Sequence, residues 1–96
     1  MSFLARVRAR SAELHAALDP LGARQIYVFG SVARGDDTEA SDVDLLVDLE
    51  PDAGIFALLQ MQGESERILE RRVDLVPRDG LKPEVVEAVT SEMILL

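Results

Sequence analysis

The sequence contains no cysteine and no tryptophan, and its single histidine is His15. The absence of cysteine excludes disulfides, thiolate zinc sites and cysteine nucleophiles, and one histidine is too few for a multi-histidine metal centre. Apolar runs are far shorter than the ~20 residues that a membrane-spanning helix needs, and the first residues lack the apolar stretch of a signal peptide. We therefore expect a cytoplasmic protein without membrane association, in which His15 is a surface residue.

Basic residues are also scarce. Ten lysine and arginine residues face 18 aspartate and glutamate residues, which gives a formal net charge of -8. Such a chain repels free nucleic acid, whose binding depends largely on phosphate neutralisation. A basic protein surface or a metal-bound ligand is the better-matched partner. The length of 96 residues and the hydrophobic content of 48% are typical of one small globular domain, residues 1–96.

Apolar spacing and turn residues predict helices that alternate with strands. The expected helices are residues 2–19, a single turn at 31–34, 55–70, and one that begins at Lys82 or Pro83 and ends near Thr90. The expected strands are residues 25–29, 43–49 and 72–76, and Ile94–Leu96 either adds an edge strand or packs on the core. This order predicts an α/β fold with a small mixed sheet of three or four strands, covered by helices on at least one face.

The segment Gly30-Ser31-Val32-Ala33-Arg34-Gly35 lies where a predicted strand passes into a helical turn. Backbone N–H groups at such a point attract anions, Gly30 allows close approach of a ligand, and the Ser31 hydroxyl and the Arg34 guanidinium can contact phosphate oxygens. The simpler interpretation is a turn glycine followed by an N-capping serine. Neither G-x-x-x-x-G-K-[ST] nor G-x-G-x-x-G occurs in the chain.

Two aspartates, Asp42 and Asp44, mark the start of the predicted strand 43–49. Side chains alternate along a strand, so both carboxylates are expected on one face, with Cα atoms about 6.5–7 Å apart. Carboxylates so placed can share hard divalent cations. Asp44 also precedes an apolar run, where a charge is costly unless it is paired or metal-bound. The alternative is a capping Asp42 and a solvent-exposed Asp44.

A third aspartate, Asp74, interrupts the apolar strand 72–76 as Asp44 interrupts its own strand. If these strands pair in suitable register, Asp74 joins the other two carboxylates, because neighbouring strands lie about 4.8 Å apart. Three convergent carboxylates repel one another unless a cation such as Mg²⁺ is bound. A lone aspartate in a strand is otherwise usually exposed to solvent.

Gly30-Ser31, ten intervening residues and then Asp42-Val43-Asp44 resemble the signature of the DNA-polymerase-β-like nucleotidyltransferases. The short chain and the wording of both segments resemble in particular the minimal nucleotidyltransferases, the antitoxins of HEPN/MNT toxin–antitoxin pairs. The resemblance extends from about Ile26 to Val76.

The resemblance implies a palm-like fold in which Asp42 and Asp44 hold Mg²⁺, with two ions expected. Asp74 would complete a catalytic triad of carboxylates and help to activate the acceptor hydroxyl. The implied reaction transfers a nucleoside monophosphate, AMP from ATP, to a hydroxyl with release of pyrophosphate. In the minimal family the acceptor is a tyrosine of the cognate HEPN ribonuclease toxin, which the modification disarms.

The resemblance further implies that Gly30 and Ser31 bind the nucleotide phosphates and that Arg34 contacts the triphosphate. Two other functions remain open: an antitoxin that masks its partner without catalysis, and a small-molecule nucleotidyltransferase that works with a separate substrate-binding subunit. The apolar segment Met93–Leu96 either supports self-association or packs internally.

Overall fold

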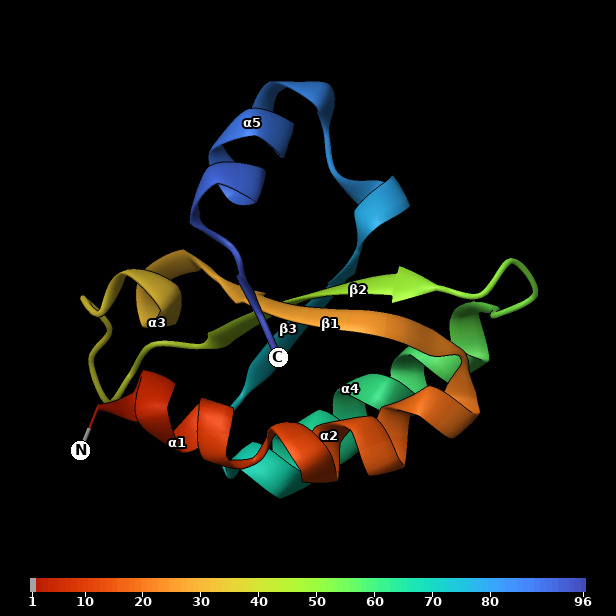
Figure 1. The fold of residues 1–96 in the computed structure, drawn as a ribbon, viewed down its shortest axis with the longest axis horizontal. Helices are drawn as coiled ribbons and strands as arrows, with labels where there is room; N and C mark the ends of the chain where they lie inside the picture. The colour runs from red at the N-terminus through yellow and green to blue at the C-terminus, as the bar shows by residue number, and fades with distance from the viewer. Residues whose placement is uncertain (1) are drawn as a thin grey trace.

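The computed structural model describes residues 2–96 and is built around one four-stranded mixed sheet (Figure 1). The strands are β1 (Ala23–Phe29), β2 (Val43–Leu49), β3 (Val73–Pro77) and β4 (Ile94–Leu95) in the spatial order β3-β2-β1-β4. Strand β1 is antiparallel to β2 and β4, whereas β2 and β3 are parallel. The predicted α/β class and the predicted number of strands are confirmed.

Within residues 2–96, five α-helices accompany the sheet: α1 (Phe3–Ala9), α2 (Ser11–Leu18), α3 (Gly30–Arg34), α4 (Ile55–Leu69) and α5 (Pro83–Glu92). Two short 3₁₀ helices, η1 (Asp19–Leu21) and η2 (Arg78–Gly80), follow α2 and β3. Helix α4 provides the crossover that a parallel pair such as β2 and β3 requires. Helices α1, α2 and α4 lie on one side of the sheet, whereas α5 lies on the other (Figure 1). Among residues 2–96, no helix is long and apolar enough to cross a membrane.

Strand β2 presents different side chains to the two faces of the sheet. Val43, Leu45 and Val47 are buried in the main core, which is formed with residues of α1, α2 and α4. The intervening residues include Asp44 and Asp48 and point to the opposite face. The alternation that builds the core therefore also directs the acidic side chains away from it, toward the side on which α5 lies.

The single helix predicted for residues 2–19 is wrong, because the structure divides it into α1 and α2 at Arg10. Arg10 leaves the helical conformation, with φ -99° and ψ 10°, and its N–H donates to the carbonyl oxygens of Arg6 and Val7. Val7 on α1 and Leu14 on α2 are both buried in the main core. Arg10 is neither proline nor glycine, so no local signal marks the break.

Other boundaries shift by a few residues. Strand β1 begins at Ala23, before the predicted Gln25, with a register irregularity between them. Strand β3 covers Val73–Pro77 and α5 continues to Glu92. Of the two alternatives for the C-terminal segment, the structure shows both in part: Ile94–Leu95 pairs with β1 as an edge strand, and Ile94 and Leu96 pack against the core.

His15 was expected at the surface, but its side chain is only 28% exposed. Its Nδ1 lies 2.9 Å from an oxygen of Asp19, and its Nε2 lies 3.3 Å from the carbonyl oxygen of Leu96. His15 thus connects α2 to the C-terminal strand segment, a structural role.

Candidate active site

The parallel pairing of β2 and β3 brings two of the three predicted acidic residues side by side. Asp44 and Asp74 are direct register partners. Partners in neighbouring parallel strands share a face of the sheet, so both carboxylates project to the face opposite the main core. Asp42 lies two residues before Asp44, just outside β2, and is exposed with Arg72 3.9 Å from its Oδ1. The register that the sequence analysis required is therefore present.

Gly30 lies directly against Asp44, at the point where β1 passes into α3. Its φ of +74° is in the left-handed region that favours glycine. A Cβ atom at this position would lie 3.0 Å from Cγ of Asp44 and closer still to Oδ2. Both the backbone conformation and the space available thus require glycine here, and the β1–α3 turn faces the carboxylates at atomic contact.

The surroundings of Asp44 disfavour its charged form. Burial raises the pKa of its carboxyl above the ordinary value of 3.8, and the negative charges of Asp74 and Asp42 raise this pKa further. The Arg34 guanidinium acts in the opposite direction, and Glu92 adds a smaller repulsion. The raised pKa is the electrostatic consequence of placing several carboxylates near one another on a partly buried strand.

These carboxylates fit a hard divalent cation chemically. Oxygen atoms of aspartate are preferred ligands of Mg²⁺, and a bound cation would relieve the repulsion that raises the pKa of Asp44. Within residues 2–96, no three histidine, cysteine, aspartate or glutamate side chains are already gathered closely enough to hold one ion. The strand register places Asp44 and Asp74 side by side, with Asp42 just before β2, and the three carboxylates would have to move closer together to share one ion.

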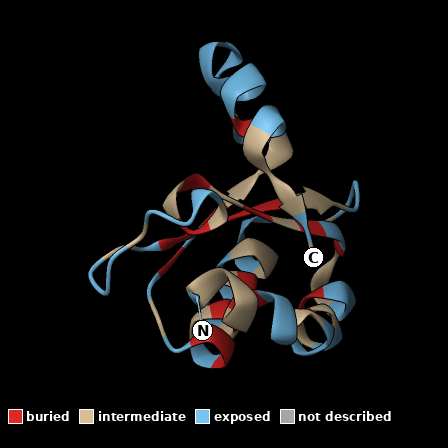
Figure 2. Ribbon diagram, turned by 60° about the vertical axis from the view of Figure 1, so that its left-hand side comes forward, coloured by how far each residue is buried: buried red, intermediate tan, exposed pale blue. Residues whose placement is uncertain are grey.

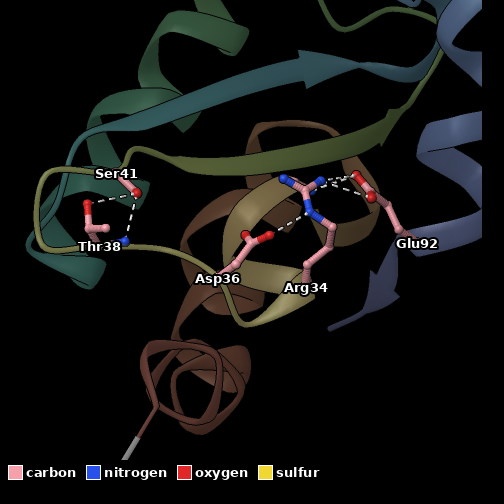
Figure 3. A network of polar contacts seen from close by, with 6 residues as sticks. Arg34, Asp36, Thr38, Ser41 and Glu92 are labelled. Atoms are coloured by element: carbon pink, nitrogen blue, oxygen red, sulfur yellow. Dashed lines mark hydrogen bonds and ion pairs between the residues drawn. The ribbon is translucent and has the colours of Figure 1, made fainter.

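Arg34 and Gly30, the predicted phosphate-binding groups, both contact a residue that the sequence analysis did not identify. The Gly30 N–H donates to Oε1 of Glu92 at 3.0 Å. Nη1 of Arg34 donates to Oε1 and Oε2 of Glu92 at 3.2 and 3.0 Å, and its Nε donates to Asp36 at 3.2 Å (Figure 3). Glu92 lies 62 residues after Gly30, on the last turn of α5, so no local pattern indicates it.

Ser31 does not cap α3, which contradicts the simpler interpretation of the Gly-Ser pair. The N-cap of α3 is Phe29, and it makes no side-chain capping bond. Ser31 is the second helical residue, and its carbonyl oxygen accepts a hydrogen bond from the Asp36 N–H at 3.0 Å. Its hydroxyl is therefore not committed to a cap.

The segment between Gly35 and Asp42 is held by Arg71, which precedes β3. Arg71 donates through Nη1 to Asp37 at 3.2 Å and to the Thr38 carbonyl at 3.4 Å. Its guanidinium lies 3.6 Å from the centre of the Phe3 ring, and its side chain is 19% exposed. Arg71 thus connects the loop that carries Asp42 to the strand that carries Asp74.

Comparison with known proteins places this arrangement in a family. A family model described as a nucleotidyltransferase domain matches residues 14–96. The chain belongs to the nucleotidyltransferase domain family. The protein adenylyltransferase MntA of Thermococcus cleftensis is 40% identical to this nucleotidyltransferase over 73 residues, which are 76% of this chain and 74% of that protein.

Solved structures agree with this assignment. A structure described as a minimal nucleotidyltransferase matches with a TM-score of 0.87 and 38% identity, covering 100% of this chain and 97% of that chain. A toxin–antitoxin complex with AMP-PNP matches with a TM-score of 0.74 and 22% identity, over 91% of this chain and 69% of that chain. A Shewanella oneidensis MNT antitoxin bound to tri-AMPylated HEPN toxin matches with a TM-score of 0.68 and 18% identity, over 92% of this chain and 69% of that chain. The last two matches show a shared fold.

Proposed function

We propose that this nucleotidyltransferase transfers AMP from ATP to a tyrosine hydroxyl of a cognate HEPN toxin and thereby acts as an antitoxin. The observation that carries the proposal is the direct pairing of Asp44 with Asp74, against a glycine turn that leaves no room for a side chain. Phosphoryl-type transfer depends mainly on positioning and charge stabilisation. A group of carboxylates beside a glycine turn that a ligand can approach closely offers positioning and charge stabilisation without a cysteine or histidine nucleophile.

In this proposal the three aspartates divide the work. Asp42 and Asp44 hold two Mg²⁺ ions, and Asp74 completes the ligand set. Mg²⁺ bound there supplies neutralisation of the triphosphate charge. The acceptor hydroxyl oxygen forms a bond to the α-phosphorus as the bond from that phosphorus to the bridging oxygen breaks, and pyrophosphate leaves. The proton of the hydroxyl passes to the carboxylate of Asp74.

The turn after β1 serves the nucleotide. The Gly30 N–H, the Ser31 hydroxyl and the Arg34 guanidinium donate to phosphate oxygens, because all three belong to the short helix α3, whose first residue lies against Asp44. Charged donors such as arginine form the stronger bonds to phosphate.

The choice of a protein acceptor rests on charge and on relatives. The formal charge of -8 disfavours a free nucleic-acid acceptor. The relative from Thermococcus cleftensis is named a protein adenylyltransferase, and the Shewanella oneidensis complex contains a tri-AMPylated HEPN toxin. A HEPN protein therefore fits as the acceptor of this chain.

The test is a transfer assay with ATP labelled at the α-phosphate, Mg²⁺ and a cognate HEPN protein. We expect label on the toxin, and loss of that label with Asp42→Asn or Asp44→Asn. Asp52→Asn is the charge-matched control, because Asp52 is exposed in the turn at the other end of β2. Neutralisation of the toxin without any label would instead support masking, and label on a small molecule would support a separate substrate-binding subunit.

A further inference from the structure

Glu92 places a carboxylate on the groups that would receive the nucleotide phosphates. Its two oxygens accept hydrogen bonds from the Gly30 N–H and from Nη1 of Arg34, at 3.0 to 3.2 Å. Figure 3 shows the side chain of Glu92 reaching from α5 to the end of Arg34. Carboxylate and phosphate oxygens use the same N–H and guanidinium donors. The Glu92 carboxylate and a nucleotide phosphate therefore cannot accept hydrogen bonds from the same donors at the same time.

We propose that Glu92 is an internal competitor for the triphosphate: its carboxylate occupies the Gly30 amide and Arg34 in the free protein and is displaced when nucleotide binds. The inference rests on the proposed function, because it concerns the same phosphate-binding groups. It adds a residue to that site which lies outside the Gly-Ser and Asp-x-Asp segments. It also assigns α5 a part in nucleotide entry.

The contact is weak enough to be exchanged. The Arg34 side chain is 50% exposed and that of Glu92 is 26% exposed. Ion pairs this accessible to water contribute little, because solvent screens them and long side chains lose freedom in forming them. A triphosphate carries more negative charge than one carboxylate and contacts more groups of the turn. We therefore expect the nucleotide to displace Glu92, at some cost in affinity.

Helix α5 is held loosely enough to follow its glutamate. Of its ten residues, all described by the structure, Val89 alone is buried. Figure 2 shows α5 standing away from the sheet and largely exposed. Both of its ends return to the sheet, through β3 on one side and β4 on the other. A shift of the Glu92 side chain and of the last turn of α5 can therefore release the contact without loss of the fold.

Repulsion also favours the exchange. Gly30 donates to Glu92 and lies against Asp44, so the two carboxylates flank the same glycine. In the free protein Arg34 offsets the charge of Glu92. Once Arg34 turns to the phosphates, Glu92 would remain as an unpaired charge among carboxylates, so leaving the site is its lower-energy outcome.

The first test measures binding of AMP-PNP with Mg²⁺ by calorimetry to the wild type, Glu92→Ala and Glu87→Ala. Glu87 is exposed on the same helix and lies five residues before Glu92, so it controls for the charge and helix effects of the substitution. Glu92→Ala removes an exposed ion pair and one hydrogen bond from a backbone N–H to the carboxylate. We therefore expect this variant to bind AMP-PNP about tenfold more tightly, which corresponds to about 1.4 kcal/mol. Glu87→Ala is expected to bind within twofold of the wild type.

The second test uses the wild type alone and does not depend on how Glu92→Ala folds. Hydrogen exchange of the free protein is compared with that of the protein saturated with AMP-PNP and Mg²⁺. We expect slower exchange at the β1–α3 turn and faster exchange in the last turn of α5. A residue that merely positions Arg34 would give slower exchange at both places, and that result would overturn the proposal.

Two further results separate this proposal from the proposed function. Equal affinities for the wild type and Glu92→Ala would overturn competition by Glu92 and leave nucleotide transfer standing. Failure of AMP-PNP to bind either protein at millimolar concentrations would overturn nucleotide transfer itself, and the competition with it.

Discussion

Replacement of Gly30 with alanine tests the geometry of the site without any ligand. The backbone at Gly30 has φ +74°, and the left-handed conformation costs a residue with a Cβ about 1–2 kcal/mol. The new Cβ would also lie 3.0 Å from Cγ of Asp44. Overpacking of this kind costs about 1–3 kcal/mol. Together these effects predict that Gly30→Ala lowers the free energy of unfolding by about 3 kcal/mol.

Gly35 provides a matched control. Its φ is +80°, but no atom lies within 4 Å of the position that a Cβ would occupy. Gly35→Ala therefore carries only the backbone cost, about 1–2 kcal/mol. Both variants are measured by urea unfolding followed by circular dichroism, since the chain has no tryptophan. The difference between them reports the contact with Asp44.

A double-mutant cycle isolates this contact. In an Asp44→Ala background the carboxylate is absent and only the Cβ of residue 44 remains, 3.3 Å from the added methyl group. Gly30→Ala should then cost only slightly more than Gly35→Ala costs in the wild type. If Gly30→Ala and Gly35→Ala were equally destabilising in the wild type, the close approach of Asp44 to the β1–α3 turn would be refuted.

Three further predictions concern other parts of the molecule. Arg78 donates to Asp48 and holds the pKa of that carboxyl below its ordinary value of 3.8, so Asp48→Asn should cost about 1 kcal/mol at pH 7. This loss of stability should disappear as the pH falls through the lowered pKa, because the Asp48 carboxyl stabilises the folded state only while it is ionised. A loss of stability that persists in strong acid would contradict the ion pair. Arg71→Ala should lower the melting temperature and raise the Mg²⁺ concentration needed for half-maximal transfer. Arg8→Ala, at an exposed position on α1, should change neither by much. Equal effects of the two substitutions would argue against an anchoring role for Arg71. AMP-PNP with Mg²⁺ should raise the melting temperature of the wild type by mass action, and an unchanged melting temperature at millimolar concentrations would count against nucleotide binding.

The sequence predicted the elements that carry strong local signals. Strand β2 was expected at residues 43–49 and is found there, because an apolar run is bounded by polar turn residues on both sides. Pro83 was expected at the first position of the last helix and is found there. The pairing of Asp44 with Asp74 was expected on condition of a suitable register, and the parallel crossover through α4 supplies that register.

The contacts that the sequence did not predict join distant parts of the chain. The break between α1 and α2 lies at Arg10, which is neither proline nor glycine, so no helix-breaking residue marks it in the sequence. The contact of Gly30 with Asp44 follows from the antiparallel register of β1 and β2, which places Phe29 opposite Asp44. Glu92 was not predicted because a glutamate near the end of a helix is usually a solvent-exposed residue without a specific role. Its contact with the β1–α3 turn exists only in the folded chain.

The central claim is that Asp42, Asp44 and Asp74 hold divalent ions opposite a turn that binds triphosphate. Its most direct test is a crystal structure with AMP-PNP and Mn²⁺, in which anomalous scattering locates the metal. We predict manganese within bonding distance of Asp42 and Asp44 oxygens, with Asp74 directed at the same centre and the phosphates on the Gly30 turn. Manganese bound elsewhere, or a triphosphate that avoids the turn while Asp74 faces solvent, would contradict the account.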